Sequence, residues 1–339
     1  MGIGLAIVAG VLLGYIFERG DFCFHSTMRG LFRRPRQLDL FRAYLLTLLI
    51  AIPLVQGMMA LGWIEPWVAP FAWPAAIFGG LIFGAGMVVA STCITGLFYK
   101  LGHGMLGVLV ALITWAIGDI MVYRGPLSGL RDWLNATQVS VDGTSATVIN
   151  LLGTSGLVLL AVLAIGMIFF LLRSPAGDRD KLWSWLPLGI ATGLFTSFAW
   201  LLADWGGSNY TYGTSSVPTQ LYLSLTAGDA LWSPWIVISL VSLVPGAFVA
   251  AYLSGTLWVR GESLMRYTEL AAGGLLMGVG AGIAGGCNLG HSLVGVPLLS
   301  MGSIATTLSM VVGLFITHRL MEMRSETSAH APDPEPQIT

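Results

Sequence analysis

The sequence predicts an all-α membrane protein of about nine transmembrane helices with short re-entrant helices, arranged as two inverted structural repeats. The chain of 339 residues is 55% hydrophobic and only 10% charged, whereas soluble domains carry about 25% charged residues. Apolar windows long enough to cross a bilayer recur along the whole chain. An eighteen-residue segment with a cysteine near its end occurs twice, once in each half.

Nine windows of about 17 to 25 apolar residues mark the expected bilayer crossings. The first window lacks the basic n-region of a signal peptide, so we interpret it as a short first span. Glycine makes up 44 of the 339 residues, well above the usual content of about 7%. This excess favours closely packed or broken helices. The windows lie near 2–17, 42–62, 75–92, 104–123, 149–172, 184–203, 234–257, 269–286 and 299–318.

The basic residues predict the orientation of these spans. All but Arg124 and Arg131 of the sixteen Lys and Arg residues fall on one side if the N-terminus is outside. Cytoplasmic loops of membrane proteins carry the excess of Lys and Arg. We therefore expect a multi-pass protein in the lipid bilayer of the bacterial inner membrane, with a periplasmic N-terminus and a cytoplasmic C-terminus.

An internal repeat lies on this topology. Residues 79–96 align without gaps on residues 273–290, and eight of the eighteen positions are identical, Cys93 with Cys287 among them. The first copy runs inward and the second outward, so inverted halves are expected, which point to a transport path near the bilayer midplane. We expect a first repeat at 1–148, a connecting helix at 149–173, a second repeat at 174–323 and a disordered cytoplasmic tail at 324–339.

The end of each repeat copy could line such a path. Glycine and short polar side chains suit a helix that stops inside the membrane, where only protein or a water-filled cavity satisfies the backbone. Helix N-termini exposed at such points favour anions. The candidate pathway residues are Thr92, Cys93 and Thr95 at the end of the first copy, and Cys287, Asn288 and His291 at the end of the second.

The third cysteine, Cys23, follows the short first span and lies between Arg19 and Arg29. This positive neighbourhood suits an anion that leaves toward the cytoplasm. Lys100 is either a further anion-attracting residue or an interfacial anchor. Two simpler interpretations stay open at this point, because a free cysteine usually acts as a small buried hydrophobe and glycines can serve helix packing alone.

Other functional classes have little support. Three cysteines cannot complete a disulfide framework, and no CxxC or CxxH spacing indicates a metal site. No HExxH, Walker A or dinucleotide motif is present, and the scattered histidines do not suit haem ligation, so neither an enzyme nor a cofactor is expected. Nothing supports nucleic-acid binding. A membrane-embedded thiol oxidoreductase remains the main enzyme alternative, because thiolates in positive surroundings are reactive.

Three motifs resemble the YeeE/YedE family of bacterial membrane proteins that take up thiosulfate and related sulfur or selenium species. They are GDFCFHSTMRG near the N-terminus, GAGMVVASTCITGLFYKLGHG in the middle and GGCNLGHSLVGVPLLSMGSIATT near the end. The resemblance implies an inverted-repeat transporter in which short re-entrant helices meet at the centre. It also implies that Cys23, Cys93 and Cys287 guide thiosulfate by S–H hydrogen bonding, and that a small TusA-like cytoplasmic sulfur-carrier protein is a partner.

Thiols suit this substrate because thiosulfate has a soft terminal sulfur as well as sulfonate-like oxygens, and a thiol is a weak donor and acceptor of comparable softness. Weak contacts at successive stations also let an ion both enter and leave. The sequence leaves open a permease for another sulfur or selenium anion. It does not identify the driving ion, the oligomeric state, or whether transport is channel-like or by alternating access.

Overall fold

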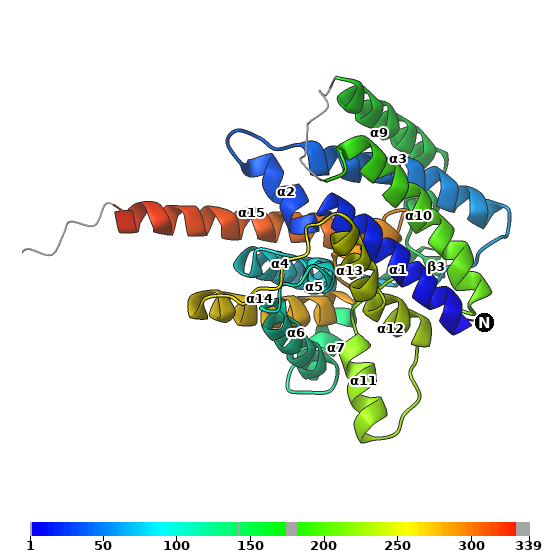
Figure 1. Cartoon of the computed structure of the whole chain (residues 1–339). Coiled ribbons are helices and arrows are strands. Elements are labelled where there is room, and N and C mark those ends of the chain that lie inside the picture. The colour runs from blue at the N-terminus through cyan, green and yellow to red at the C-terminus, as the bar shows by residue number, and fades with distance from the viewer. Residues whose placement is uncertain (1, 142, 174–181, 330–339) are drawn as a thin grey trace, which may run out of the picture.

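The computed structural model describes residues 2–141, 143–173 and 182–329 of the chain (Figure 1). Within these ranges eight helical segments are long and apolar enough to cross a membrane. Helices α6 (Val108–Tyr123) and α7 (Ser128–Asn135) pass the same test together but are bent by 65°, which gives up to nine spans. The predicted multi-pass helical fold is confirmed. The eight segments are Gly2–Phe32, Asp39–Ala60, Trp73–Gly102, Thr154–Leu172, Trp185–Trp205, Pro234–Leu253, Leu264–Ala284 and Met301–Met323.

The remaining helices follow in chain order, and several of the segments contain two of them. Up to the middle of the chain they are α1 (Gly2–Gly20), α2 (Phe24–Phe32), α3 (Asp39–Ala60), α4 (Trp73–Ala90), α5 (Ile94–Gly102), α8 (Val148–Leu152) and α9 (Thr154–Leu172). After it come α10 (Trp185–Trp205), α11 (Val217–Thr226), α12 (Pro234–Val241), α13 (Leu243–Leu253), α14 (Leu264–Ala284), the π-helix η1 (Leu289–Gly295) and α15 (Met301–Ala329).

Short helices follow breaks in the long ones. Helix α4 ends at Ser91 and helix α14 ends at Gly285, both in the left-handed conformation with φ of 52° and 79°. A left-handed residue commonly ends a helix. Within four residues of each break a new helix begins, α5 after α4 and η1 after α14. The breaks are where the sequence predicted them, at the ends of the two repeat copies.

Helices α4 and α14 form the centre of the fold and approach each other closely. A Cβ atom at Gly79 would lie 2.8 Å from the carbonyl oxygen of Gly280, and one at Gly273 would lie 2.4 Å from the backbone nitrogen of Ala90. Small residues at a helix interface allow such contact between backbones. The repeat glycines could serve helix packing or line a pathway, and these contacts show that they serve helix packing.

The other helices surround this pair. Helix α14 also packs on α6, and α4 packs on α15, while α1 lies against α12 and α13, and α10 lies against α3. Figure 1 shows α9 at the edge of the bundle beside α3, where Phe41 and Phe170 stack edge to face. Only 11% of the apolar window in α9 is buried, which leaves most of its surface for lipid.

The connecting loops gather in two groups. In one group the backbone N–H of Trp67 donates to Asn209, and a small antiparallel sheet joins β1 (Phe71–Ala72), β2 (Gln138–Val141) and β3 (Thr144–Ser145). In the other group the N–H of Leu106 donates to the carbonyl of Arg260. Residues 174–181, with Lys181, lie outside the described residues. Of the predicted tail at 324–339, residues 324–329 continue helix α15, and the part from residue 330 onward lies outside the described residues.

Candidate functional site

Two of the three predicted thiols are in contact. Cys23 Sγ lies 3.3 Å from Cys93 Sγ, and the backbone N–H of Cys93 donates to Cys23 Sγ at 3.3 Å. Thr92 Oγ1 lies 3.8 Å from Cys23 Sγ. Both cysteines are completely buried. We call Cys23 and Cys93 the thiol pair.

The local sequence places each of these thiols at the start of a short helix. Cys23 precedes α2 and Cys93 precedes α5, both with extended backbones, and the N–H of Gly96 donates to Cys93 Sγ at 3.3 Å. Position 96 needs glycine, because a Cβ there would lie 2.3 Å from Thr92 Oγ1. Helix N-termini carry partial positive charge, so the thiol pair lies where two helix ends favour an anion.

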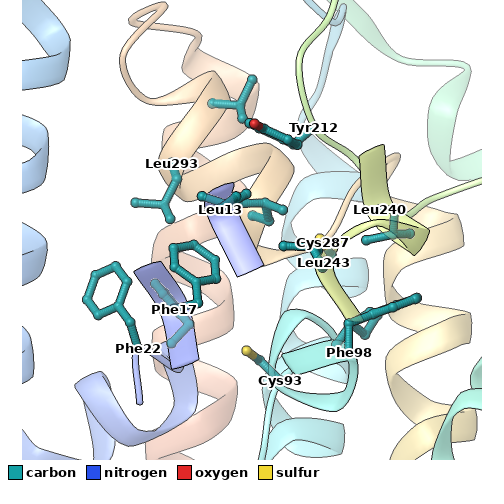
Figure 2. Packing of buried hydrophobic residues seen from close by; sticks show 14 of the residues in the cluster. Leu13, Phe17, Phe22, Cys93, Phe98, Tyr212, Leu240, Leu243, Cys287 and Leu293 are labelled. Atoms are coloured by element: carbon teal, nitrogen blue, oxygen red, sulfur yellow. The ribbon is translucent and has the colours of Figure 1, made fainter. Parts of the chain in front are cut away.

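The third thiol, Cys287, lies in the same buried cluster as the pair, as Figure 2 shows for Cys93 and Cys287. The two backbones match locally. The N–H of His291 donates to the carbonyl of Cys287 at 2.9 Å, and the N–H of Leu97 donates to that of Cys93 at 3.0 Å. Among the described residues no hydrogen bond joins Cys287 to another thiol. The structure thus shows a thiol contact of Cys93 with Cys23, and none with its repeat counterpart Cys287 among the described residues.

A large cavity of about 820 Å³ lies on one side of this cluster. Its wall comes from the segment between α10 and α11, from the start of α12 and from the residues around η1, and includes Tyr210, Ser216, Gly286 and His291. The wall is mostly apolar, and these four residues are among those that offer polar side chains or exposed backbone to a small anion. His291 is thus a predicted pathway residue that lines a cavity.

A second cavity, of about 390 Å³, lies beside the start of α2, and we call it the arginine cavity. Arg29 and Arg33 are in its wall together with the acidic Asp21 and Asp39. Arg29 lies more than one helix turn beyond Cys23 along α2 and lines this cavity. The mixed charge makes the arginine cavity less positive than the sequence alone indicated.

A central void lies within the core between helices of both halves. Its volume of about 10 Å³ is at the lower limit for a single water molecule, so no polyatomic anion fits. Figure 2 shows Phe17, Phe22 and Leu293 from this region. The core is closed in this conformation. The void is lined by Phe17, Phe22, Phe24, Thr27, Tyr44, Thr95, Asn288, Ser292 and Leu293.

Several buried polar atoms near these spaces lack a hydrogen-bond partner among the described residues. Three belong to predicted residues, namely Thr95 Oγ1, Asn288 Oδ1 and His291 Nε2. Buried polar groups are normally paired, and an exception marks a place where water, an ion or a ligand can complete the bonding. Thr95 and Asn288 line the central void, and His291 lines the large cavity. These atoms provide polar stations within the closed core and at the large cavity.

Lys100 lies half-buried in the last turn of α5, at the end of that helix away from Cys93. Like Thr92 and the three cysteines, it lines none of the three cavities. Its role as an interfacial anchor therefore fits the geometry better than direct contact with an anion. Across the described residues no three His, Cys, Asp or Glu side chains gather as a metal site.

Asp119 is an important residue that sequence reasoning missed. Its carboxylate is completely buried and accepts hydrogen bonds from Ser216 N–H at 2.9 Å, Thr219 N–H at 3.2 Å and Thr219 Oγ1 at 2.6 Å. It thereby caps α11 and holds Ser216 in the wall of the large cavity. The available signal was a single acid inside the apolar window 108–123, since ionisable residues within spans are costly and have specific roles.

Two further contacts fasten α5 to α1 beside the thiol pair. Tyr99 donates its hydroxyl to Asp21 Oδ1 at 2.8 Å, and His103 Nδ1 lies 2.5 Å from Glu18 Oε1. The hydrogen bond with Glu18 raises the pKa of His103 above its ordinary value. These pairs restrain the two breaks that carry Cys23 and Cys93. They join residues about 80 positions apart, so no local sequence pattern revealed them.

Comparison with known proteins identifies relatives of this chain. The chain is 26% identical to the thiosulfate transporter TsuA of Escherichia coli K12, over 95% of this chain and 96% of the relative. It is 27% identical to the thiosulfate transporter TsuA of Spirochaeta thermophila, over 92% and 96% of the two chains. The probable transporter YedE of Salmonella typhimurium is 34% identical over 31% of this chain and 25% of its own length. Residues 19–316 match the family described as sulphur transport, and the chain therefore belongs to that family, also known as YeeE/YedE.

Proposed function

We propose that the protein takes up thiosulfate across the bacterial inner membrane along a central path lined by Cys23, Cys93 and Cys287. The observation that carries this proposal is the buried contact of 3.3 Å between the sulfur atoms of the thiol pair. Two free thiols at converging helix N-termini offer soft S–H donors in a place that favours negative charge. The two relatives that match over more than 90% of the chain are both named thiosulfate transporters, which supports thiosulfate as the substrate.

The path runs from the large cavity past His291 and Cys287, then by Asn288 and Thr95 at the central void, and reaches the thiol pair. From there the arginine cavity, with Arg29 in its wall, leads out. Each station offers a donor or a soft sulfur, and none offers a full set of strong ligands. Weak successive contacts allow the ion to be released as well as bound.

Passage requires the core to open, because the central void holds at most one water molecule. Phe17, Phe22 and Leu293 line the void, and their rotation would widen it. Aromatic and aliphatic side chains at a constriction can gate by excluding water. The closed structure thus corresponds to a resting state between transport events.

The fold is proposed to consist of two inverted repeats at 1–148 and 174–323, joined by a connecting helix at 149–173 and followed by a cytoplasmic tail. Helix packing supports this division. The approach of Gly79 to Ala284 has its counterpart in the approach of Gly273 to Ala90, with the two halves exchanged. The short helices α2 and α11 begin 193 residues apart, close to the offset of 194 between the two repeat copies.

All but two of the sixteen Lys and Arg residues fall on one side of the predicted spans, and this side is expected to be cytoplasmic. That orientation gives a periplasmic N-terminus, a periplasmic large cavity and a cytoplasmic arginine cavity. Thiosulfate would then enter at the large cavity and leave beside Arg29 and Arg33. A small TusA-like sulfur carrier could receive it there, at the basic segment 18–42. No step of the proposal consumes the substrate, so the protein acts as a transporter and not as an enzyme.

Uptake by the reconstituted protein tests this function. Proteoliposomes should accumulate ³⁵S-labelled thiosulfate, and unlabelled sulfate should compete poorly, whereas a selenium analogue of thiosulfate should compete well. A Cys93→Ala protein reconstituted at the same density is the matched control. Efficient competition by sulfate would remove the case for thiosulfate selectivity. Conversion of thiosulfate without accumulation would support a thiol oxidoreductase instead.

A further inference from the structure

His291 differs from the other residues of the large cavity because one of its ring nitrogens is held and the other is free. His291 Nδ1 lies 3.1 Å from Ser303 Oγ, and Nε2 has no hydrogen-bond partner among the described residues. The side chain is only 5% exposed and lies in the middle of the π-helix η1. Single π-helical turns occur frequently at functional sites.

Ser303 determines which nitrogen carries the proton. The Ser303 hydroxyl has one hydrogen, and within the described residues His291 Nδ1 is its only hydrogen-bond partner. If Nδ1 were protonated, the serine hydrogen would be left without an acceptor in a buried place, which is unfavourable. The satisfied arrangement has Ser303 donating to Nδ1, so that Nε2 carries the ring proton.

The surroundings of Nε2 leave room for an acceptor. A Cβ at Gly286 would lie 2.7 Å from Nε2, so only glycine leaves the ring in place there, and Gly286 lines the large cavity together with His291. The carbonyl of Ala284 lies close enough to the ring to interact with it, but Nε2 makes no hydrogen bond of ordinary geometry with any described residue. A buried N–H on the cavity wall therefore awaits an acceptor.

The repeat itself sets this position apart. Continuing the alignment of residues 79–96 with residues 273–290 by one position places His291 opposite Leu97, which is completely buried. In the same alignment Gly286 stands opposite Thr92. The two halves thus share a cysteine, but only the second has a histidine four positions after it. Packing alone would be served by leucine at both positions.

We infer that His291 binds the oxygen end of the anion through Nε2–H and that Ser303 positions the ring by holding it in this tautomer. The inference rests on the proposed function, since it names the residue that reads the sulfonate-like oxygens. With the oxygens held by His291, the terminal sulfur points toward the thiols. The large cavity therefore orients thiosulfate to enter the path sulfur first.

The test measures binding of thiosulfate to the purified protein in detergent by calorimetry. His291→Ala and His291→Leu should weaken binding by about tenfold or more, as expected when one hydrogen bond to a charged group is lost. His291→Gln keeps an N–H donor at a similar reach and should recover most of the affinity. His318→Gln, in α15 and away from all three cavities, is the matched control and should bind like the wild type.

The positioning role of Ser303 has its own pair of variants. Ser303→Ala removes the hydroxyl and should weaken binding several-fold, whereas Ser303→Thr keeps the hydroxyl and should restore it. Ser239→Ala, which removes another buried hydroxyl from α12, serves as the control. The melting temperature without ligand shows whether a variant is folded. If a His291 variant unfolds, the comparison of Ser303→Ala with Ser303→Thr still tests whether the His291 ring binds the anion.

Three results would overturn the inference. Equal affinity of wild type, His291→Ala and His291→Leu would show that the ring does not bind the anion. Equal losses in His291→Ala and His291→Gln would show that the N–H donor is not the reason. Equal affinity of Ser303→Ala and Ser303→Thr would exclude the tautomer argument. Absence of any thiosulfate binding by the wild type would instead contradict the proposed function.

Discussion

Replacing Cys93 separates the role of its sulfur from its role in the fold. Cys93 Sγ contacts Cys23 Sγ and accepts the N–H of Gly96, both at 3.3 Å, and it occupies the N-cap position of α5. Cys93→Ala removes the capping acceptor, which costs about 0.5–2 kcal/mol. Cys93→Ser restores it, because serine is a preferred N-cap residue. The serine variant should therefore be close to the wild type in stability.

Uptake should behave differently. If the soft sulfur guides thiosulfate, Cys93→Ser should lose uptake as completely as Cys93→Ala, although it keeps a small hydrogen-bonding group and the helix cap. A lost hydrogen bond to a charged group is worth about 1.5–3 kcal/mol, which corresponds to roughly a 10- to 150-fold loss at the constriction. Cys23→Ala and Cys287→Ala should weaken uptake more variably, because water and neighbouring polar groups can replace them in part.

The assay is the initial rate of ³⁵S-thiosulfate uptake into proteoliposomes, normalised to reconstituted protein, with the melting temperature measured on the same preparations. The expected pattern is a serine variant that is stable and inactive. Near-normal uptake by a well-folded Cys93→Ser protein would show that size and polarity are sufficient. The sulfur-relay mechanism would then have to be abandoned.

Three further predictions concern topology, the thiol pair and Asp119. A reporter fused after Arg36 should be cytoplasmic and one fused near Ser208 periplasmic, and a periplasmic signal at Arg36 would reverse the orientation. Oxidation with diamide, which accepts the two thiol hydrogens, should link Cys23 to Cys93 in a disulfide seen by peptide mass spectrometry and block uptake until a reductant is added. A disulfide from either of these cysteines to Cys287 instead would contradict the 3.3 Å contact. Asp119→Ala should destabilise the protein by about 2 kcal/mol or more in urea unfolding, because three buried donors lose their acceptor, and an unchanged free energy of unfolding would show that the α11 cap is unimportant.

Much of the architecture was predictable because lipid imposes simple rules on sequence. Apolar windows predicted the spans, and the structure has a helix or a bent helix pair for each of the nine. The gapless glycine repeat predicted two related broken helices, and these are α4 and α14, which meet at the centre of the fold. The ends of individual helices were predicted less accurately than the spans. The sequence does not show, for example, where α1 ends and α2 begins within the segment Gly2–Phe32.

The candidate site was predictable only as a set of separate residues. The sequence indicated Cys23, Cys93 and Cys287, but contact between Cys23 and Cys93, 70 positions apart, depends on how α1 and α5 pack. The equivalent positions of Cys93 and Cys287 in the repeat said nothing about the contact of Cys93 with Cys23. Ser303 gave no signal at all, because its importance follows from one hydrogen bond to His291.

The most direct test of the central claim is to locate the anion within the protein. Selenosulfate replaces the terminal sulfur of thiosulfate by selenium, whose anomalous scattering marks the position of that atom in crystals of the complex. The account predicts a selenium peak on the line from the large cavity to the thiol pair, in contact with Cys287 or Cys93 and with the oxygen end toward His291. A selenium peak away from all three cysteines would contradict it.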